Sequence, residues 1–280
     1  MSIVIEPTDQ ACGARVSGVD LSQPLDQVQV AEIRAAWLEH HVLVFPNQAI
    51  DDDDLERFTL YFGPFGNDDF FGPIPGREPM AGSRSGGDES SPLLAGTFHT
   101  DWSFQEKPAQ GTCLRSITIP PTGGHTLFAD QHLAYEQMPA ELKSRLAGKQ
   151  AIHSAKLPYS KNGAYGESDQ ASGRSMDIRA SDAALEERTH PIFRPHPETG
   201  KTAVFGAMGY IIGFDGMDAE EAIPLVKELY AWQTREEFQY KHAWEADMLV
   251  MWDNRSVLHA ATGGYEGHDR LLHRTTIGTP

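Results

Sequence analysis

The sequence has no long apolar run, few cysteines and a deficit of positive charge. Its longest apolar runs, such as residues 42–45, are far shorter than the roughly 20 residues that a membrane span needs, so we expect no membrane segment. Neither a basic region nor an apolar stretch follows Met1, which argues against a signal peptide. The two cysteines, Cys12 and Cys113, cannot build a disulfide framework. We therefore expect a cytoplasmic protein in a reducing environment.

The charge balance narrows the possible partners. The chain carries 23 Lys and Arg against 40 Asp and Glu, for a formal net charge of −17. A field of that sign repels phosphate backbones and anionic membrane surfaces, so we expect neither nucleic acid nor membrane as a partner. A small molecule is the expected partner, and if it is anionic it must be held by locally concentrated Arg or Lys.

Hydrophobic periodicity predicts many short strands and a few amphipathic helices. Strands are expected over residues 2–6, 14–21, 41–45, 110–119, 125–129, 150–155, 190–196, 202–205, 238–244, 248–252, 257–261 and 270–277. Helices are expected over residues 26–40, 51–61, 131–138, 139–147 and 218–232. Pro224 predicts that the last helix begins late or kinks. The four aspartates at 51–54 suit a helix N-terminus, with metal binding as the alternative.

Two segments, 63–96 and 156–189, are polar, rich in Gly and Ser and poor in periodicity. Each is long for a connection within a domain, which indicates a functional lid or disorder. No repeat or low-complexity linker divides the chain. We therefore expect one domain over residues 1–280, rich in β-strands, with helices outside and these two loop insertions at one mouth.

A His-X-Asp step and a distant histidine are the candidate metal ligands. His99 and Asp101 are two residues apart, and in an extended strand such positions point to the same face. His259 follows a predicted strand and the turn Trp252-Asp253-Asn254-Arg255. Two imidazoles and one carboxylate leave three coordination positions open, the arrangement of non-haem Fe(II) oxygenases. The alternative for His259 is a surface or core histidine.

Two arginines share the last predicted strand. Arg270 and Arg274 are four residues apart, so on a regular strand they face the same way as Leu272, and His273 faces the opposite way. A bulge between them would break this relation. Arg forms bidentate contacts with carboxylates that Lys cannot form, so the pair fits a pocket for two anionic groups. The alternative is that both arginines are outward solubilising residues.

Several segments, in this order along nearly the whole chain, resemble the taurine dioxygenase/2,4-dichlorophenoxyacetate dioxygenase (TauD/TfdA) family of Fe(II)- and 2-oxoglutarate-dependent dioxygenases. The matching segments are Gly18-Val19-Asp20-Leu21, His99-Thr100-Asp101-Trp102-Ser103-Phe104, Pro121-Thr122-Gly123-Gly124-His125-Thr126-Leu127-Phe128, His196-Pro197-Glu198-Thr199-Gly200-Lys201, Trp252-Asp253-Asn254-Arg255 with His259, and His273-Arg274-Thr275-Thr276.

This resemblance implies a mainly β fold with flanking helices, a double-stranded β-helix (jelly roll, cupin-like). It also implies that His99, Asp101 and His259 bind Fe(II). 2-Oxoglutarate and O₂ are the implied cosubstrates, and the C5 carboxylate of 2-oxoglutarate is expected to contact Thr126 and Arg270.

The same resemblance places Arg274 at the substrate end of the site. A buried guanidinium needs an anionic partner, so we expect the substrate to carry an anionic group unless an internal Asp or Glu pairs with Arg274. Tyr159 and Tyr210 are candidate substrate contacts, with core packing as the alternative. The loops 67–72 and 91–98 depart from the taurine-using pattern, which argues against taurine itself.

The expected activity couples oxidative decarboxylation of 2-oxoglutarate to oxidation of a C–H bond in a small, anionic organic substrate. Succinate and CO₂ are released, and hydroxylation can lead to cleavage of a C–S, C–O or C–N bond. Two alternatives remain: a jelly-roll sensor that binds metal without turnover, and a zinc hydrolase with the same three ligands. A hydrolase would have no need for Arg270 and Thr126. We also expect a homo-oligomer, a dimer or a tetramer.

Overall fold

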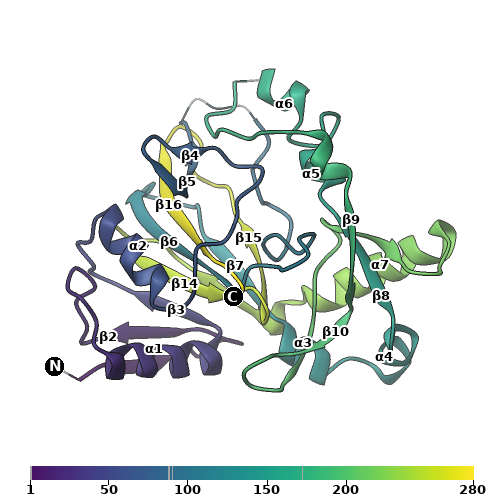
Figure 1. The fold of residues 1–280 in the computed structure, drawn as a ribbon, viewed down its shortest axis with the longest axis horizontal. Coiled ribbons are helices and arrows are strands. Elements are labelled where there is room, and N and C mark those ends of the chain that lie inside the picture. Colours follow the sequence, from purple (N-terminus) through teal and green to yellow (C-terminus); the bar gives the residue numbers. More distant parts are fainter. Residues whose placement is uncertain (1, 88, 90, 172) are drawn as a thin grey trace.

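The computed structural model describes residues 2–87, 89, 91–171 and 173–280, and the fold is mainly β with helices on the outside (Figure 1). An eight-stranded sheet has the strand order β1-β2-β3-β14-β6-β16-β5-β4, and all of its neighbouring strands are antiparallel except the pair β2 and β3. These strands are β1 (Val4–Pro7), β2 (Ala14–Ser17), β3 (Val42–Phe45), β4 (Pro73–Ile74), β5 (Arg77–Ser85), β6 (Gly111–Thr118), β14 (Leu249–Asp253) and β16 (Arg270–Ile277).

Smaller sheets complete the β-structure. A three-stranded antiparallel sheet has the order β13-β7-β15, with β7 (Thr126–Asp130), β13 (Gln239–His242) and β15 (Val257–Ala261). The other strands are β8 (Gln150–Ser154), β9 (Glu187–Pro191), β10 (Phe193–Pro195), β11 (Thr202–Val204) and β12 (Ile211–Phe214). The helices are α1 (Gln27–His40), α2 (Asp52–Leu60), α3 (Gln131–Glu136), α4 (Ala140–Leu146), α5 (Lys156–Tyr159), α6 (Glu167–Ala171) and α7 (Ala219–Gln233), with 3₁₀ helices η1 (Asp182–Leu185) and η2 (Glu236–Phe238).

The eight-stranded sheet and the β13-β7-β15 sheet bury one apolar cluster between them. Val250, Trp252 and Leu272 of the larger sheet pack in the same cluster as Phe128 and Tyr240 of the smaller one. Each fully buried large side chain stabilises the fold by about 1.5–3 kcal/mol. The layer between the two sheets is also where β15 and β16 carry His259 and Arg270, so the packing of this core sets the distance between those side chains.

Helices α1 and α2 cover the outer face of the larger sheet (Figure 1). Both begin with a capping box, in which the side chain of Asp26 or Asp51 accepts a hydrogen bond from the backbone N–H of the third residue of its helix. This confirms the helix-terminus interpretation of the aspartate run at 51–54. Asp52 has a second role, because its carboxylate joins helix α2 to the sheet through Arg115 and His273.

The long helix near the C-terminus departs from its prediction. Helix α7 begins at Ala219, capped by Asp218, and continues through Pro224. Of the two outcomes expected from Pro224, the late start is wrong and the kink stays a prediction. Buried side chains such as Leu225 and Leu229 hold the helix against its neighbours. Strand β12, which pairs with β8, was also missed.

The segment 63–96 is more ordered than its composition predicts. It contains β4 and the nine-residue strand β5, which pairs with β16 from Thr275↔Met80 to Arg270↔Ser85. The ladder to β16 stabilises β5, whose own sequence has no apolar alternation. The segment 156–189 contains α5, α6, η1 and the start of β9. Interpreting the two segments as wholly irregular loops is therefore wrong.

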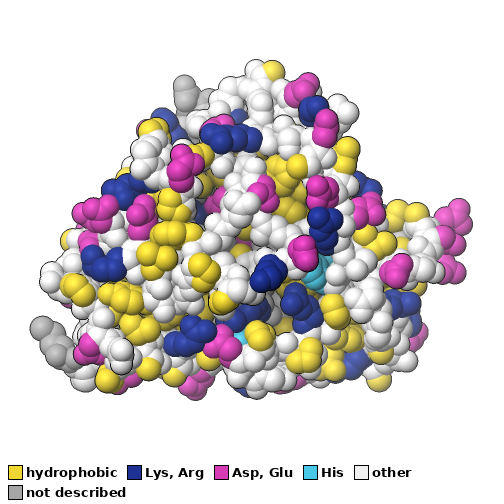
Figure 2. All heavy atoms as spheres, viewed as in Figure 1, with side chains coloured by type: hydrophobic (Ala, Val, Ile, Leu, Met, Phe, Trp, Pro, Cys, Tyr) yellow, Lys and Arg dark blue, Asp and Glu magenta, His cyan; other side chains and the backbone are white. Residues whose placement is uncertain are grey.

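The surface carries charges of both signs. On the face seen in Figure 2, Lys and Arg side chains are interspersed with Asp and Glu side chains. Elsewhere in the structure, charged side chains of opposite sign pair, as Arg77 does with Asp53 and Glu56. In the part of the chain that the structure describes, none of the helices has the length and apolar character to cross a membrane.

Candidate metal centre

A local pairing between two distant segments brings the two candidate histidines together. His99 and His259 form an isolated antiparallel bridge, with His99 N donating to His259 O at 3.0 Å and His259 N donating to His99 O at 2.8 Å. Their ring centroids lie 4.3 Å apart. The extended backbone on which the pairing of His99 and Asp101 was argued is not present, because Asp101 lies in a turn that includes Trp102 at φ 53°. That turn nevertheless carries the Asp101 carboxylate toward both imidazoles.

The three side chains form a compact donor set. One ligand atom each of His99, Asp101 and His259 lie within 4.8 Å of one another. Asp101 Oδ1 is 3.8 Å from His99 Nε2 and 3.7 Å from His259 Nε2. These separations are too long for hydrogen bonds and leave room for an ion among the three atoms. His99 Nδ1 lies 2.9 Å from Thr97 O, which leaves Nε2 of that ring for a metal.

Burial and neighbouring charges together give these groups the protonation states that a metal requires. Burial lowers the pKa of His99, and it lowers that of His259 to about 3. Burial alone would raise the pKa of Asp101, but Arg274 and the two histidines bring it down to about 2. Near neutral pH the site therefore offers two neutral imidazoles and one carboxylate. Together with the spacing of their atoms, this donor chemistry fits a divalent transition metal.

A cavity of about 260 Å³ opens onto these residues. Its walls combine strands of both sheets with the two insertions. The candidate residues among its lining are His99, Asp101, Thr126, Tyr159, His259, Arg270 and Arg274. The segment 63–96 contributes Phe71 and Glu89, and the segment 156–189 contributes Arg174 and Met176. Both insertions thus lie at one mouth, as the sequence predicts.

Strand β16 presents its two arginines as expected. Arg270, Leu272 and Arg274 all line the cavity, while His273 faces away and its Nδ1 lies 2.7 Å from Asp52 Oδ1. A register shift does occur here, because Leu271 pairs with Thr118 and Leu272 with Ser116. The extra residue lies in β6, so the alternation along β16 is preserved.

Arg270 is a buried cation whose charge is not balanced by a neighbour. It is 8% exposed, and no carboxylate in the described residues forms an ion pair with it. Burial lowers its pKa, and its Nε has no hydrogen-bond partner among those residues. A Cβ added at Gly124 would lie 3.2 Å from that Nε, so only glycine lets the backbone approach so closely. An anion entering the cavity would supply the missing partner.

Thr126 also lines this cavity, and its hydroxyl oxygen already accepts one hydrogen bond. Trp244 Nε1 donates to Thr126 Oγ1 at 3.0 Å. An indole N–H can only donate, so the threonine uses a lone pair there and keeps its own proton for another acceptor. The hydroxyl is therefore suited to donate to an anion in the cavity. Sequence reasoning missed Trp244, because no motif along the chain links it to Thr126.

Arg274 differs from Arg270 because it has internal carboxylate partners. Its Nη2 lies 3.3 Å from Asp101 Oδ2 and 3.7 Å from Asp68 Oδ1. Burial would lower its pKa, but Asp101 and Asp68 raise it. The structure therefore agrees with the alternative in which internal carboxylates pair with Arg274, so this arginine does not by itself require an anionic substrate. Its Nε, however, has no hydrogen-bond partner in the described part of the chain.

Asp68 comes from the first insertion and lies deep beside the site. Trp102 Nε1 and Thr276 Oγ1 both donate to its Oδ1, the latter at 2.9 Å. Its Oδ2 is buried without a partner among the described residues. Burial raises the pKa of Asp68, although Arg274 opposes this shift. Sequence reasoning missed this residue, since nothing along the chain links position 68 to position 274.

The two candidate tyrosines belong to an aromatic cluster beside the metal ligands. Tyr159 lines the cavity and stacks on Phe70 at a centroid distance of 5.0 Å. Tyr210 is buried next to it, with the two hydroxyl oxygens 3.5 Å apart, and its ring lies edge-on to His99. Tyr159 is thus placed to contact a ligand in the cavity, whereas Tyr210 packs behind it.

Comparisons with known proteins agree with this geometry. The family model described as "Taurine catabolism dioxygenase TauD, TfdA family" matches residues 5–276. The chain belongs to the TauD/TfdA family. It is 31% identical over 282 residues to an (S)-phenoxypropionate/alpha-ketoglutarate-dioxygenase of Sphingobium herbicidovorans, covering 99% of this chain and 95% of that protein. It is also 31% identical over 296 residues to an alpha-ketoglutarate-dependent 2,4-dichlorophenoxyacetate dioxygenase of Cupriavidus pinatubonensis, covering 99% and 98%.

A solved structure extends the match to three dimensions. The crystal structure of a taurine dioxygenase from Burkholderia xenovorans superposes with a TM-score of 0.81 at 28% identity, covering 100% of this chain and 92% of that one. The family and its relatives make this protein an alpha-ketoglutarate-dependent dioxygenase, an oxidoreductase. This result favours the dioxygenase over the sensor and the zinc hydrolase.

Proposed function

We propose that this TauD/TfdA-family protein uses Fe(II), 2-oxoglutarate and O₂ to hydroxylate a small organic substrate, with release of succinate and CO₂. One observation carries the proposal: the His99, Asp101 and His259 cluster shares a cavity with the buried Arg270, which has no ion-pair partner among the described residues. Three protein ligands leave open positions on the metal, where bound iron supplies the redox chemistry. A zinc hydrolase would gain nothing from an unbalanced guanidinium in that cavity.

In this proposal, Arg270 and Thr126 hold the distal carboxylate of 2-oxoglutarate. The carboxylate would balance the charge of Arg270 and accept charge-assisted hydrogen bonds from its guanidinium. Thr126 would add a donor, since Trp244 occupies one of its lone pairs. Both contacts orient the cosubstrate relative to His99 and Asp101, which is the positioning that this chemistry requires.

We further propose that the substrate combines an apolar, aromatic-sized body with an anionic group. Phe71, Trp102, Tyr159 and Met176 line the cavity and suit an apolar body. The names of the compared relatives include phenoxypropionate and 2,4-dichlorophenoxyacetate, which have this combination. Arg274 offers its unpartnered Nε to the anionic group, while Asp68 and Asp101 moderate its attraction. Hydroxylation beside a heteroatom would lead to cleavage of a C–O, C–S or C–N bond.

We also propose a fold type and a domain organisation for the whole chain. The two facing sheets are the layers of a double-stranded β-helix (jelly roll), and residues 1–280 form one catalytic domain. The family match over residues 5–276 supports both statements. A homo-oligomeric state, dimer or tetramer, and a cytoplasmic location stay predictions, and sedimentation would decide the first.

Succinate formation tests the proposed activity. The protein is freed of metal with a chelator, loaded anaerobically with Fe(II) and 2-oxoglutarate, and exposed to O₂ with a panel of aryloxy acids, alkyl sulfates, sulfonates and neutral analogues. We expect succinate in proportion to oxidised product, with activity restored by Fe(II) and not by Zn(II). Absence of succinate with every substrate, or full activity with Zn(II), would contradict the proposal.

A further inference from the structure

The two oxygens of the Asp101 carboxylate have different surroundings. Oδ1 faces both histidines, at 3.8 Å from His99 Nε2 and 3.7 Å from His259 Nε2. Oδ2 instead accepts a hydrogen bond of 2.6 Å from Thr112 Oγ1, and Arg274 Nη2 lies 3.3 Å away. One oxygen is therefore directed toward the metal position, and the other is already engaged by the protein.

The direction of the bond from Thr112 is fixed by a chain of donors. Trp252 Nε1 donates to Asn254 Oδ1 at 2.9 Å, and an indole can only donate, which assigns the amide orientation of Asn254. The Asn254 amide nitrogen then donates to Thr112 Oγ1 at 3.0 Å. Since Thr112 accepts there, its own proton is available for Asp101 Oδ2. All four side chains are buried, so water does not compete for these bonds.

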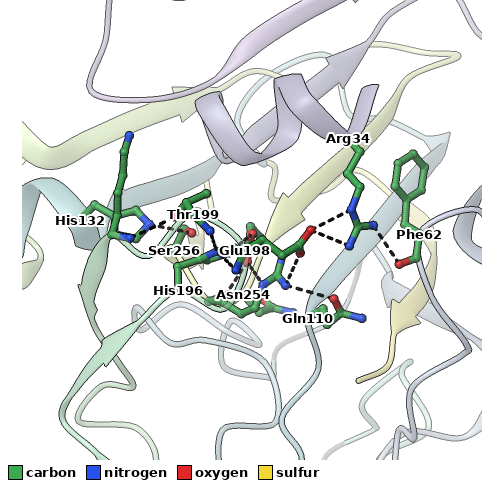
Figure 3. A network of polar contacts seen from close by, with 12 residues as sticks. Arg34, Phe62, Gln110, His132, His196, Glu198, Thr199, Asn254 and Ser256 are labelled. Carbon is green, nitrogen blue, oxygen red and sulfur yellow. Dashed lines mark hydrogen bonds and ion pairs between the residues drawn. The ribbon is translucent and has the colours of Figure 1, made fainter. Parts of the chain in front are cut away.

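The backbone around Asn254 is held by a larger polar network, part of which Figure 3 shows. Asn254 O accepts from Thr100 Oγ1 at 2.6 Å, and Asn254 N donates to Gln110 O at 2.9 Å. The preceding residue, Asp253, accepts two hydrogen bonds from the Arg255 side chain, each at 2.8 Å. Arg255 in turn pairs with Glu198, which also binds Arg34 on α1. The turn that carries Asn254 is therefore tied through these contacts to neighbouring segments of the chain.

We propose that Thr112 and Asn254 are positioning residues that hold the Asp101 carboxylate with Oδ1 directed at the metal position. A carboxylate that is free to rotate would have to be ordered when the ion binds, which weakens the affinity for the metal. Thr112 prevents this by holding Oδ2, and Asn254 prevents Thr112 from turning its proton elsewhere. The inference rests on the proposed metal site and adds two residues to it that do not touch the metal.

Conservative variants test the inference through their affinity for a metal ion, without a measurement of activity. Thr112→Val removes the hydroxyl and keeps the shape, Thr112→Ser keeps the hydroxyl, and Asn254→Asp replaces the donating amide by an acceptor. The affinity of the chelator-treated protein for Mn(II) is measured from the electron paramagnetic resonance signal of free Mn(II). We expect Thr112→Val and Asn254→Asp to weaken Mn(II) binding about 10–100-fold and Thr112→Ser to stay near wild type.

A matched control separates positioning from stability. Thr59 Oγ1 shares a buried hydrogen bond of 2.6 Å with Thr275 on the other side of the sheet, so Thr59→Val loses a comparable bond remote from the metal position. We expect Thr59→Val to lower the melting temperature without changing Mn(II) affinity. Wild-type Mn(II) affinity in a folded Thr112→Val or Asn254→Asp variant would overturn the inference. Absence of Mn(II) binding by the wild-type protein would instead overturn the proposed metal site.

Discussion

At the scale of single residues, the contrast between Arg270 and Arg274 governs what the cavity can bind. Both residues are 8% exposed. Only Arg274 has carboxylates within 4 Å among the described residues, and these are Asp68 and Asp101. A buried guanidinium without a partner gains more from an anion than one that is already paired. Arg270 is therefore the stronger anion site. Arg274 is called the tuned site here, because Asp68 and Asp101 reduce its attraction for an anion.

Arg270→Lys tests the stronger site. Lysine keeps the charge but loses the planar fork that pairs with a carboxylate through two hydrogen bonds. Loss of about 1.5–3 kcal/mol of charged hydrogen bonding should weaken 2-oxoglutarate binding roughly 10–100-fold. Anaerobic titration of the Fe(II) protein with 2-oxoglutarate measures this, with Arg235→Lys at the surface as the control. Unchanged affinity would show that Arg270 does not hold the cosubstrate.

Asp68→Asn tests the tuned site. The Asn oxygen can still accept from Trp102 and Thr276, and the new amide replaces the unpartnered Oδ2, so the fold should tolerate it. Removing a negative charge 3.7 Å from Arg274 should strengthen binding of an anion about tenfold or more. Calorimetry measures the affinity of the protein, loaded with Mn(II) and 2-oxoglutarate, for phenoxyacetate and for neutral phenoxyethanol. The difference between the two separates the effect of the anionic group from that of the aromatic body.

Asp69→Asn, next in the chain and exposed, is the matched control for Asp68→Asn. A gain for phenoxyacetate alone, and only in Asp68→Asn, supports the moderating role of Asp68. Equal affinities for phenoxyacetate in the wild-type protein and Asp68→Asn would contradict it.

Residue identity along the chain predicts some of these roles and not others. The even spacing of Arg270 and Arg274 predicted their common face, because alternation is a local property of a strand. The partner Asp68 comes from a loop some two hundred positions away, and Thr112 from another strand. Contacts of that kind form only when the chain folds, and neither residue type nor spacing predicts them.

At the scale of elements, the two insertions are joined above the cavity. Arg174 of the second insertion forms a bidentate ion pair with Asp169 and donates to Pro92 O of the first insertion at 2.9 Å. Its Nη1 also lies 3.6 Å from Glu89 Oε1. Three of these side chains, Arg174, Asp169 and Glu89, are nearly buried, with exposures of 3–4%. This contact couples the position of one insertion to that of the other.

Arg174→Gln should loosen both insertions together. Breaking a buried ion pair costs about 3 kcal/mol or more, enough for roughly hundredfold faster local exchange. Hydrogen exchange of residues 91–95 and 160–171 measures this, with Arg179→Gln in an exposed pair of the same segment as the control. In the wild-type protein we expect Fe(II), 2-oxoglutarate and phenoxyacetate, added anaerobically, to slow exchange in both segments. Equal, strong protection without ligands would contradict a lid.

The elements that the sequence failed to predict share a physical cause. Strand β5 has no apolar alternation and is held by its ladder with β16, and β12 is held by β8. Helix α7 tolerates Pro224 because apolar side chains on both sides of it are buried. Where an element had its own signal, as in the capped helices α1 and α2, the prediction is confirmed within a few residues.

At the scale of the whole molecule, buried neutral histidines predict acid sensitivity. Burial lowers the pKa of His41 to about 4, and that of His153, His242 and His259 to about 3. Their unfolded pKa is near 6.5, so below that pH the unfolded chain binds more protons than the folded one. Stability is then present above pH 6.5 and is lost as pH falls toward 3–4. The raised pKa of Asp68 opposes this loss, but it is a single group.

Urea unfolding of the chelator-treated protein measures this loss. Each histidine contributes a slope of up to about 1.4 kcal/mol per pH unit, so the free energy of unfolding should fall by several kcal/mol between pH 7 and pH 5. His242→Gln removes one titrating group remote from the metal ligands and should lower the slope by about one proton. A free energy of unfolding that is level across this range would contradict the account.

The whole-chain pattern explains why the activity was predictable while its specificity was not. The matching segments are spread over nearly the entire sequence, and the fold brings His99, Asp101 and His259 together from two of them. Substrate contacts come from insertions whose packing depends on the rest of the molecule. Tyr159 is a candidate substrate contact from the sequence, but its place in one aromatic lining with Phe71 and Trp102 could be identified only in three dimensions.

The central claim is that one cavity holds both an iron bound by His99, Asp101 and His259 and a 2-oxoglutarate bound by Arg270. Anaerobic addition of 2-oxoglutarate to the Fe(II) protein tests it most directly, read as a weak metal-to-ligand charge-transfer band in the visible spectrum. We predict a band that saturates with 2-oxoglutarate, is lost in His259→Ala and needs far more 2-oxoglutarate in Arg270→Lys. A wild-type protein without the band, or a His259→Ala protein with the wild-type band, would contradict the claim.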